Sequence, residues 1–111
     1  MNELKNVDVH SALTAIEAGA ILLDVRQIDE WEAGHAPTAI HVSLNELPDR
    51  LDDLAKDRLI VCVCRSGGRS TRATMFLLEQ GFDAVNLEGG MLAWSSLGAD
   101  MVAETGEPTV V

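Results

Sequence analysis

Short runs of apolar residues alternate with amphipathic stretches along the chain, and this pattern predicts strands that alternate with helices. Two of the runs are almost continuously apolar, which is typical of strands buried on both faces of a sheet. The first predicted strand ends at Val7, and the other four cover residues 20–25, 39–42, 59–63 and 84–87. Strands separated by helices predict a three-layer α/β domain over residues 1–100, in which a central, mainly parallel five-stranded sheet carries helices on both faces.

Capping residues and apolar periodicity place three helices. Asp8 can cap a helix that runs to Ala18, where the following glycine is a natural stop. Residues 70–80 form the clearest helix, because their apolar positions share one side and Gly81 follows the last of them. A final short helix is expected over residues 90–96.

Two further helices and a tail complete the predicted order. Residues 29–32 (DEWE) resemble a capping box that opens a very short helix, which Gly34 would end. Asn45 can cap another helix, whose apolar stripe consists of Leu47, Leu51 and Leu54. Residues 101–111 are acidic and show no periodicity, so they are predicted to form a C-terminal tail.

The net charge of the chain and its distribution limit the kinds of ligand and partner that can be expected. The 111 residues are 47% hydrophobic, which is enough to bury a core without disulfides, and carry a formal net charge of −10. This charge argues against nucleic acid and anionic membranes as partners. No acidic residue occurs from Arg58 to Leu78, and this window holds Arg58, Arg65, Arg69 and Arg72. A cationic region in an acidic chain predicts a small anionic ligand.

Cysteine usage and hydropathy indicate the compartment. Cys62 and Cys64 are one residue apart on a predicted strand, where a disulfide would be badly strained. No second pair of ligands lies at a spacing suited to a metal, so no metal is expected. No apolar run approaches the ~20 residues that span a bilayer, and residues 1–5 do not resemble a secretion signal. We therefore expect a monomer in the reducing cytoplasm, with no membrane partner.

The stretch VCVCRSGGRS, residues 61–70, places the thiol of Cys64 at the carboxyl end of a strand, where ligands bind in α/β folds. Gly67 and Gly68 let successive backbone N–H groups face inward as an anion-binding nest. The following helix directs its positive end toward the loop, and the nearby arginines add positive potential. These features together predict a lowered pKa for the Cys64 thiol and a reactive thiolate.

The loop Cys64-Arg65-Ser66-Gly67-Gly68-Arg69-Ser70 resembles the active-site loop of the rhodanese family, the thiosulfate sulfurtransferases. Two further segments match in the same order. Residues 23–26 (LDVR), with 30–31 (EW) and 34–37 (GHAP), resemble the N-terminal signature of the family, and residues 87–94 (LEGGMLAW) resemble the C-terminal one. The resemblance covers roughly residues 7–97 and implies a five-stranded parallel sheet.

The resemblance also implies a function without a metal or an organic cofactor. Cys64 would take a sulfane sulfur from a donor such as thiosulfate, carry it as a persulfide, and pass it to cyanide, a thiol or a protein. Arg65 and Arg69 would bind the anionic donor. The remaining loop residues, which would shape the nest and begin the helix, are Ser66, Gly67, Gly68 and Ser70.

Two alternatives stay open at this point. The domain could be a carrier that hands its persulfide to a partner protein, since that intermediate is common to both activities. A cysteine phosphatase or arsenate reductase also places a thiolate and an arginine before a helix. Only four residues separate Cys64 from Arg69, however, and the related phosphatases have five. The shorter ring is better suited to one sulfur atom than to a tetrahedral phosphate.

Other polar and aromatic residues have simpler interpretations. Cys62 is expected in the core, with a redox partnership to Cys64 as a secondary possibility. Asp24 and Arg26 follow a strand at the expected active edge, where an ion pair or a loop anchor is favoured. His35 is expected to tie down the loop that contains it.

Overall fold

Five short strands form a single sheet in the computed structural model, which describes residues 3–111. They are β1 (Asn6–Val7), β2 (Ile21–Asp24), β3 (Ile40–His41), β4 (Ile60–Val63) and β5 (Ala84–Leu87). Their order across the sheet is β1-β5-β4-β2-β3, and every pairing is parallel. The predicted five-stranded sheet is confirmed, and β4 lies at its centre.

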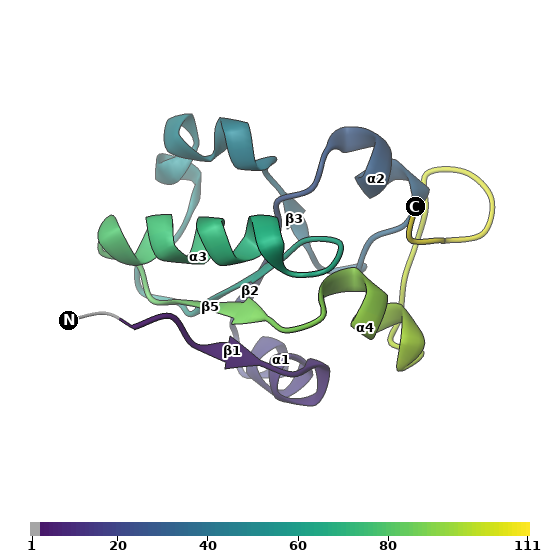
Figure 1. Ribbon diagram of the computed structural model, residues 1–111, viewed down its shortest axis with the longest axis horizontal. Coiled ribbons are helices and arrows are strands. Elements are labelled where there is room, and N and C mark those ends of the chain that lie inside the picture. Colours follow the sequence, from purple (N-terminus) through teal and green to yellow (C-terminus); the bar gives the residue numbers. More distant parts are fainter. Residues whose placement is uncertain (1–2) are drawn as a thin grey trace.

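Helices cover both faces of this sheet, as the sequence predicts. They are α1 (Val9–Glu17), α2 (Ile28–Ala33), α3 (Gly68–Glu79) and α4 (Gly90–Ser96), together with the 3₁₀ helices η1 (Leu44–Asp49) and η2 (Leu51–Asp53). Side chains of α3 and η1 pack on one face of the sheet, and those of α1 and α4 pack on the other. Figure 1 shows α1 and α3 on opposite sides of the strands.

Neighbouring residues of the central strands are buried on opposite faces. Leu23 and Cys62 belong to the core under α3, whereas Leu22 and Val61 belong to the core over α1 and α4. All four are at most 1% exposed. Burial on both sides explains why these strands appear in the sequence as continuous apolar runs and not as an alternation of apolar and polar residues.

Two helices begin earlier than the sequence predicts. The helix expected over residues 70–80 begins at Gly68, since Gly67 turns the chain with a φ of 124° and its carbonyl accepts from the Thr71 N–H. The capping box of α2 lies two residues earlier than the expected one over residues 29–32. Its N-cap is Gln27, whose N–H donates to the carboxylate of Glu30.

The helix predicted to start at Asn45 is also wrong, because the segment forms a different type of helix. The segment forms the two 3₁₀ helices η1 and η2, with Ser43 at the N-cap position. Pro48 lies inside η1 and has no N–H for an α-helical hydrogen bond. The predicted apolar stripe does face the core, because Leu47 and Leu54 are buried and Leu51 packs against them.

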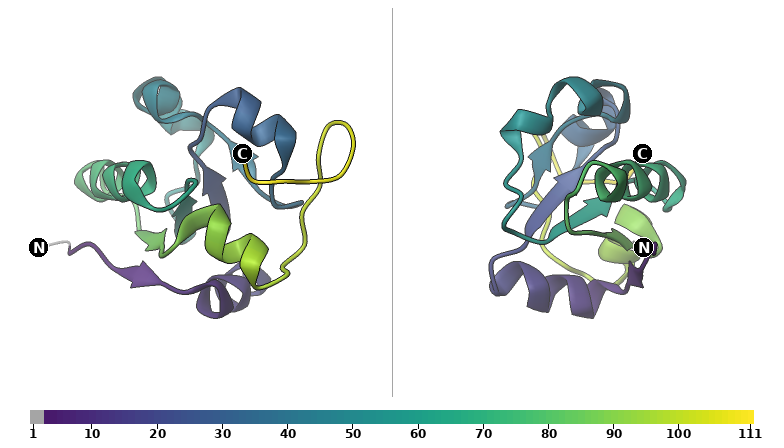
Figure 2. Two further views of the ribbon diagram at one scale, coloured as in Figure 1. Left: turned by 45° about the vertical axis from the view of Figure 1, so that its right-hand side comes forward. Right: turned by 90° about the vertical axis from the view of Figure 1, so that its left-hand side faces the viewer.

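The tail, residues 101–111, packs against the domain and forms no helix or named strand. Val102 exchanges two backbone hydrogen bonds with His35 in an isolated antiparallel bridge. Met101 and Val110 pack beside the core over α1 and α4. Figure 2 shows this segment leaving α4, looping outward, and returning toward α2.

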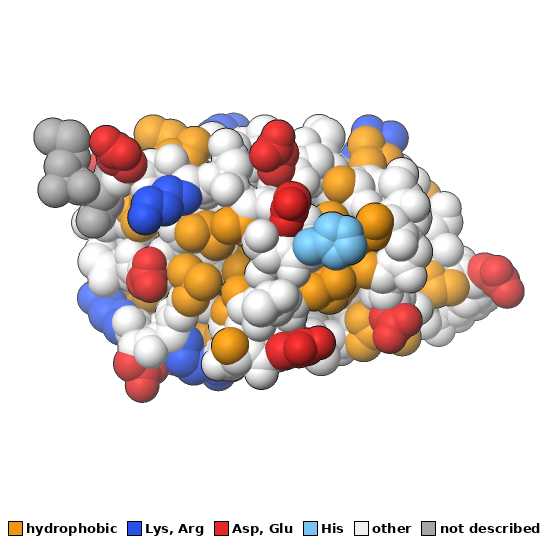
Figure 3. Space-filling model, turned by 90° about the horizontal axis from the view of Figure 1, so that it is seen from below, with side chains coloured by type: hydrophobic (Ala, Val, Ile, Leu, Met, Phe, Trp, Pro, Cys, Tyr) orange, Lys and Arg blue, Asp and Glu red, His pale blue; other side chains and the backbone are white. Residues whose placement is uncertain are grey.

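The surface on the α1 side reflects the acidic composition. Figure 3 views this face from below and shows acidic side chains spread among small hydrophobic patches, with basic side chains at the left and along the upper edge. None of the helices in residues 3–111 is long and apolar enough to span a membrane.

Candidate active site

The loop after β4 lies at the middle of the sheet's carboxyl edge. Cys64 is the first residue beyond β4, residues 65–67 make a tight turn, and α3 begins at Gly68. The pairing of Val63 with Asp24 places the end of β2 beside this turn. The topology therefore brings the cysteine loop and the β2–α2 connection together at one site.

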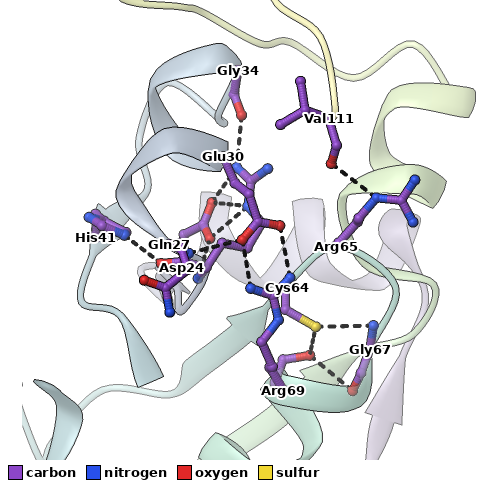
Figure 4. Close-up of polar contacts among 12 residues, drawn as sticks. Asp24, Gln27, Glu30, Gly34, His41, Cys64, Arg65, Gly67, Arg69 and Val111 are labelled. Atoms are coloured by element: carbon purple, nitrogen blue, oxygen red, sulfur yellow. Dashed lines mark hydrogen bonds and ion pairs between the residues drawn. The ribbon is translucent and has the colours of Figure 1, made fainter. Parts of the chain in front are cut away.

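The sulfur of Cys64 lies inside a ring of hydrogen-bond donors (Figure 4). The Gly67 N–H donates to Sγ at 3.1 Å, and the Ser70 hydroxyl donates to it at 3.2 Å. Burial raises the pKa of the Cys64 thiol, but the hydroxyl and N–H of Ser70, with the N–H groups of Gly67 and Ser66, lower it further than burial raises it. The net pKa is below its ordinary value, and the thiolate is favoured.

A second helix explains why the loop amides face the sulfur. The N–H of Met91 donates to the carbonyl of Cys64 at 2.8 Å, and that of Leu92 donates to the carbonyl of Arg65 at 3.1 Å. Both donors lie in the first turn of α4. The two carbonyls are therefore held toward α4, and the N–H of Ser66, which follows the Arg65 carbonyl, is one of the groups that lower the pKa of Cys64. Gly90 allows this approach, because a Cβ there would lie 2.5 Å from both carbonyl oxygens.

The loop arginines do not donate to the sulfur. Arg69 forms a bidentate pair with Glu30, with Nη1–Oε1 and Nη2–Oε2 distances of 2.6 and 2.8 Å. This hydrogen bonding lowers the pKa of Glu30 and raises that of Arg69, whose charge also interacts with Cys64. Arg65 donates from Nε to the backbone oxygen of Val111 at 3.0 Å. The arginines thus supply long-range potential, and the backbone and Ser70 supply the direct contacts.

Asp24 and Arg26 anchor the elements around the loop. Both are fully buried, and Arg26 donates from Nε and Nη2 to the Asp24 carboxylate at 2.8–3.1 Å. Its Nη2 also donates to the carbonyl of Gly34 at 2.7 Å. This ion pair, which the sequence favoured, ties the end of β2 to the end of α2. It therefore fixes the helix that carries Glu30 against Arg69.

The second cysteine is chemically different. Cys62 is fully buried in β4, and burial raises the pKa of its thiol to about 12. Cys62 and Cys64 are both free thiols. The core assignment of Cys62 agrees with its burial, and a thiol with this pKa stays protonated near neutrality.

Two histidines close to α2 in the sequence stack on Trp31. Trp31 stacks on His35 with ring centroids 3.6 Å apart, and His41 stacks more loosely at 5.0 Å. His35 Nδ1 lies 2.7 Å from the Trp31 carbonyl, and His41 Nε2 lies 2.7 Å from that of Arg26. The expected role of His35 as a tie for its loop agrees with these contacts. No three His, Cys, Asp or Glu side chains of residues 3–111 gather as a metal site.

Sequence reasoning did not identify three of the contacts that build the site. These are the Glu30–Arg69 pair, the contact of the α4 N-terminus with the loop, and the hydrogen bond from Arg65 to the tail. The first two involve residues inside the motifs described above, so the motifs marked the right segments without giving their contacts. The tail carries no motif, and its acidic, aperiodic sequence gave no signal.

Comparison with known proteins agrees with this architecture. Residues 8–97 match the family model described as a rhodanese-like domain. A protein named putative sulfurtransferase YtwF, from Bacillus subtilis, is 40% identical over 94 residues, which are 83% of this chain and 91% of that protein. The thiosulfate sulfurtransferase GlpE of Pseudomonas syringae is 33% identical over 95 residues, covering 85% of this chain and 90% of the relative.

A solved structure shows the same fold. The crystal structure of a rhodanese-related protein from Thermoplasma volcanium superposes with a TM-score of 0.83 at 28% identity. The match covers 88% of this chain and 97% of that one.

Proposed function

Because this chain belongs to the rhodanese-like domain family, we propose that it transfers a sulfane sulfur from an anionic donor such as thiosulfate to a nucleophilic acceptor. Cys64 carries the sulfur between the two as a persulfide. The observation that carries the proposal is the ring of donors around Sγ, formed by Gly67 and Ser70, together with the lowered pKa of the thiol. The relatives named as sulfurtransferases support the same chemistry.

The reaction divides into two displacements. The Cys64 thiolate attacks the outer sulfur of thiosulfate, a Cys–S bond forms, and the sulfur–sulfur bond of the donor breaks. Sulfite leaves with the electron pair of that bond. An acceptor such as cyanide, a thiol or a protein thiolate then attacks the terminal sulfur, and the thiolate of Cys64 is released. Because the donor product leaves before the acceptor reacts, ping-pong kinetics are expected.

The loop residues divide this work between charge and shape. The N–H groups of Ser66, Gly67 and Ser70 stabilise the negative charge on Sγ and then on the terminal persulfide sulfur. Gly67 supplies the φ of 124° that the turn requires, and Gly68 leaves open space above the turn, since a Cβ there would meet no atom within 4 Å. Arg65 attracts the sulfonate end of the donor. Arg69 holds α2 in place through Glu30 and adds positive potential.

Intact mass spectrometry after incubation with thiosulfate tests the proposal. The native chain should gain one sulfur atom, and Cys64→Ser should gain none. Cys62→Ala is the matched control, because it removes the buried thiol and leaves the loop donors in place, and it should still gain one sulfur. Persulfide formation by Cys64→Ser would contradict the assigned nucleophile.

Adding cyanide or a thiol then separates the enzyme from the carrier alternative. Repeated turnover with small acceptors supports the enzyme. A stable persulfide that these acceptors do not discharge would support a carrier that delivers sulfur to a partner protein.

A further inference from the structure

The C-terminal tail, residues 101–111, is built into the rim of the proposed active site, and we call it the strap. It runs along the end of α2 and the residues just after it. Backbone hydrogen bonds join Glu104 to Glu32 at 3.1 Å, Thr109 to Ala33 at 2.9 Å, and Val102 reciprocally to His35 at 2.8 and 2.9 Å. The matched family model ends at residue 97, so the strap lies outside it.

Gly34 allows the strap to pack this closely. A Cβ at this position would lie 2.5 Å from the carbonyl oxygen of Thr109 and 2.7 Å from its nitrogen. The φ of Gly34 is 171°, which is extended backbone that any residue can adopt. The strap is therefore what makes a side chain at position 34 unfavourable.

Beyond Thr109 the strap crosses from α2 to the cysteine loop. Its last contact is the 3.0 Å hydrogen bond in which Nε of Arg65 donates to the backbone oxygen of Val111. Figure 4 shows the Arg65 side chain extending toward Val111 and away from the Cys64 sulfur. The terminal guanidinium nitrogens of Arg65 make no hydrogen bond within residues 3–111, so they remain available to an anion.

We propose that the strap positions Arg65 to bind the leaving end of an anionic sulfur donor. Attack on the outer sulfur is in line, so the sulfonate lies on the far side of that sulfur from Sγ. A cation that binds the sulfonate must therefore point outward from the loop, and the strap holds Arg65 in this direction. Both terminal nitrogens of Arg69 donate to Glu30, which directs this guanidinium toward α2, so we assign the sulfonate to Arg65.

Fixing one long side chain in advance saves the cost of ordering it when the donor binds. Immobilising such a side chain alters a binding constant by about two- to tenfold. Release of the strap should lower the reactivity of Cys64 toward anionic reagents by about this factor and leave neutral reagents unaffected. This inference rests on the proposed chemistry of Cys64.

Two alkylating reagents test the proposal without any sulfur transfer. Iodoacetate and iodoacetamide alkylate a thiol through the same carbon atom. Iodoacetate carries a negatively charged carboxylate, whereas iodoacetamide carries a neutral amide. Thr109→Pro removes the N–H that binds Ala33, whereas Thr109→Ala keeps it and serves as the matched control. Gly34→Ala displaces the strap by a different route, because the added Cβ would collide with the backbone of Thr109. The ratio of the iodoacetate rate to the iodoacetamide rate at Cys64 should fall about two- to tenfold in Thr109→Pro and Gly34→Ala. It should not fall in Thr109→Ala.

Two further measurements connect this ratio to Arg65 and to the donor. Arg65→Gln should lower the ratio in the same way, and adding Thr109→Pro to Arg65→Gln should lower it no further. For thiosulfate, which is an anion, Thr109→Pro should raise KM. An unchanged ratio in both strap variants would overturn the proposal. An equal loss with both reagents would also overturn it, because the strap would then support the thiolate and not Arg65. Failure of the sulfur-transfer proposal would appear separately, as the absence of a persulfide on the native chain.

Discussion

Gly90 is the residue through which α4 holds the cysteine loop, and its substitution by alanine offers a sharp test of the site's construction. The φ of Gly90 is 59°, a left-handed conformation that side chains disfavour. A Cβ at this position would also lie 2.5 Å from the carbonyl oxygens of Cys64 and Arg65. Since these atoms belong to the backbone, the loop or the helix must move.

The expected loss of stability has two parts. A left-handed alanine costs about 1–2 kcal/mol, and weakening the hydrogen bonds from Met91 and Leu92 costs about 0.5–1.5 kcal/mol each. Gly90→Ala should therefore lower the free energy of unfolding by about 2–5 kcal/mol. Gly98→Ala is the matched control. The φ of Gly98 is 80°, but no atom lies within 4 Å of its Cβ position, so only the first part applies.

Urea unfolding measures the stability of both variants, and the pH dependence of iodoacetamide alkylation measures the reactivity of Cys64. Gly98→Ala should keep the native alkylation profile. Gly90→Ala should shift the profile toward higher pH, because carbonyls that leave α4 no longer turn the loop N–H groups toward the sulfur. Equal stability losses in the two variants, or an unchanged alkylation profile in Gly90→Ala, would refute this account of the loop.

Two further predictions concern the thiols. Because hydrogen bonding lowers the pKa of Cys64 in the folded chain, its thiolate contributes stability above the unfolded pKa, and this contribution is lost as the pH falls through the folded pKa. The difference in unfolding free energy between the native chain and Cys64→Ser should therefore grow as the pH rises from the lowered folded pKa toward the unfolded pKa of about 8.5, and a constant difference in urea titrations would contradict the lowered pKa. Burial raises the pKa of Cys62 to about 12, so mass spectrometry should find one alkylated cysteine in the folded chain near neutral pH and two in urea. A second label on the folded chain would show that Cys62 is accessible.

Where one local pattern determined the structure, the sequence was enough to predict it. The strand over residues 84–87 and the helix over 90–96 have the predicted bounds, because apolar runs and flanking glycines mark both. The predicted helix beginning at Asn45 failed, since a cap residue and an apolar stripe fit a 3₁₀ segment as well as an α-helix once Pro48 removes an N–H. Local cues of this kind do not distinguish the two.

The site shows the same division between local and long-range information. A strand, a cysteine, two glycines and a helix are contiguous, so the ring of donors around Cys64 could be anticipated. The pairing of Arg69 with Glu30 joins residues 39 positions apart, and that of Arg65 with Val111 joins residues 46 positions apart. Such contacts depend on how the sheet orders its strands and on where the tail returns. No periodicity within a single element contains that information.

The distribution of charge around Cys64 favours sulfur transfer over phosphate chemistry. A phosphoryl group spreads its charge over several oxygens and needs cations directed at them. Here Arg69, the cation that ends the loop, is turned toward Glu30, and the direct contacts to the sulfur come from the Gly67 N–H and the Ser70 hydroxyl. Neutral donors stabilise a single anionic sulfur without binding it as an ion pair. In the proposed reaction, such donors would stabilise the persulfide on Cys64 and would still let its terminal sulfur pass to the next nucleophile.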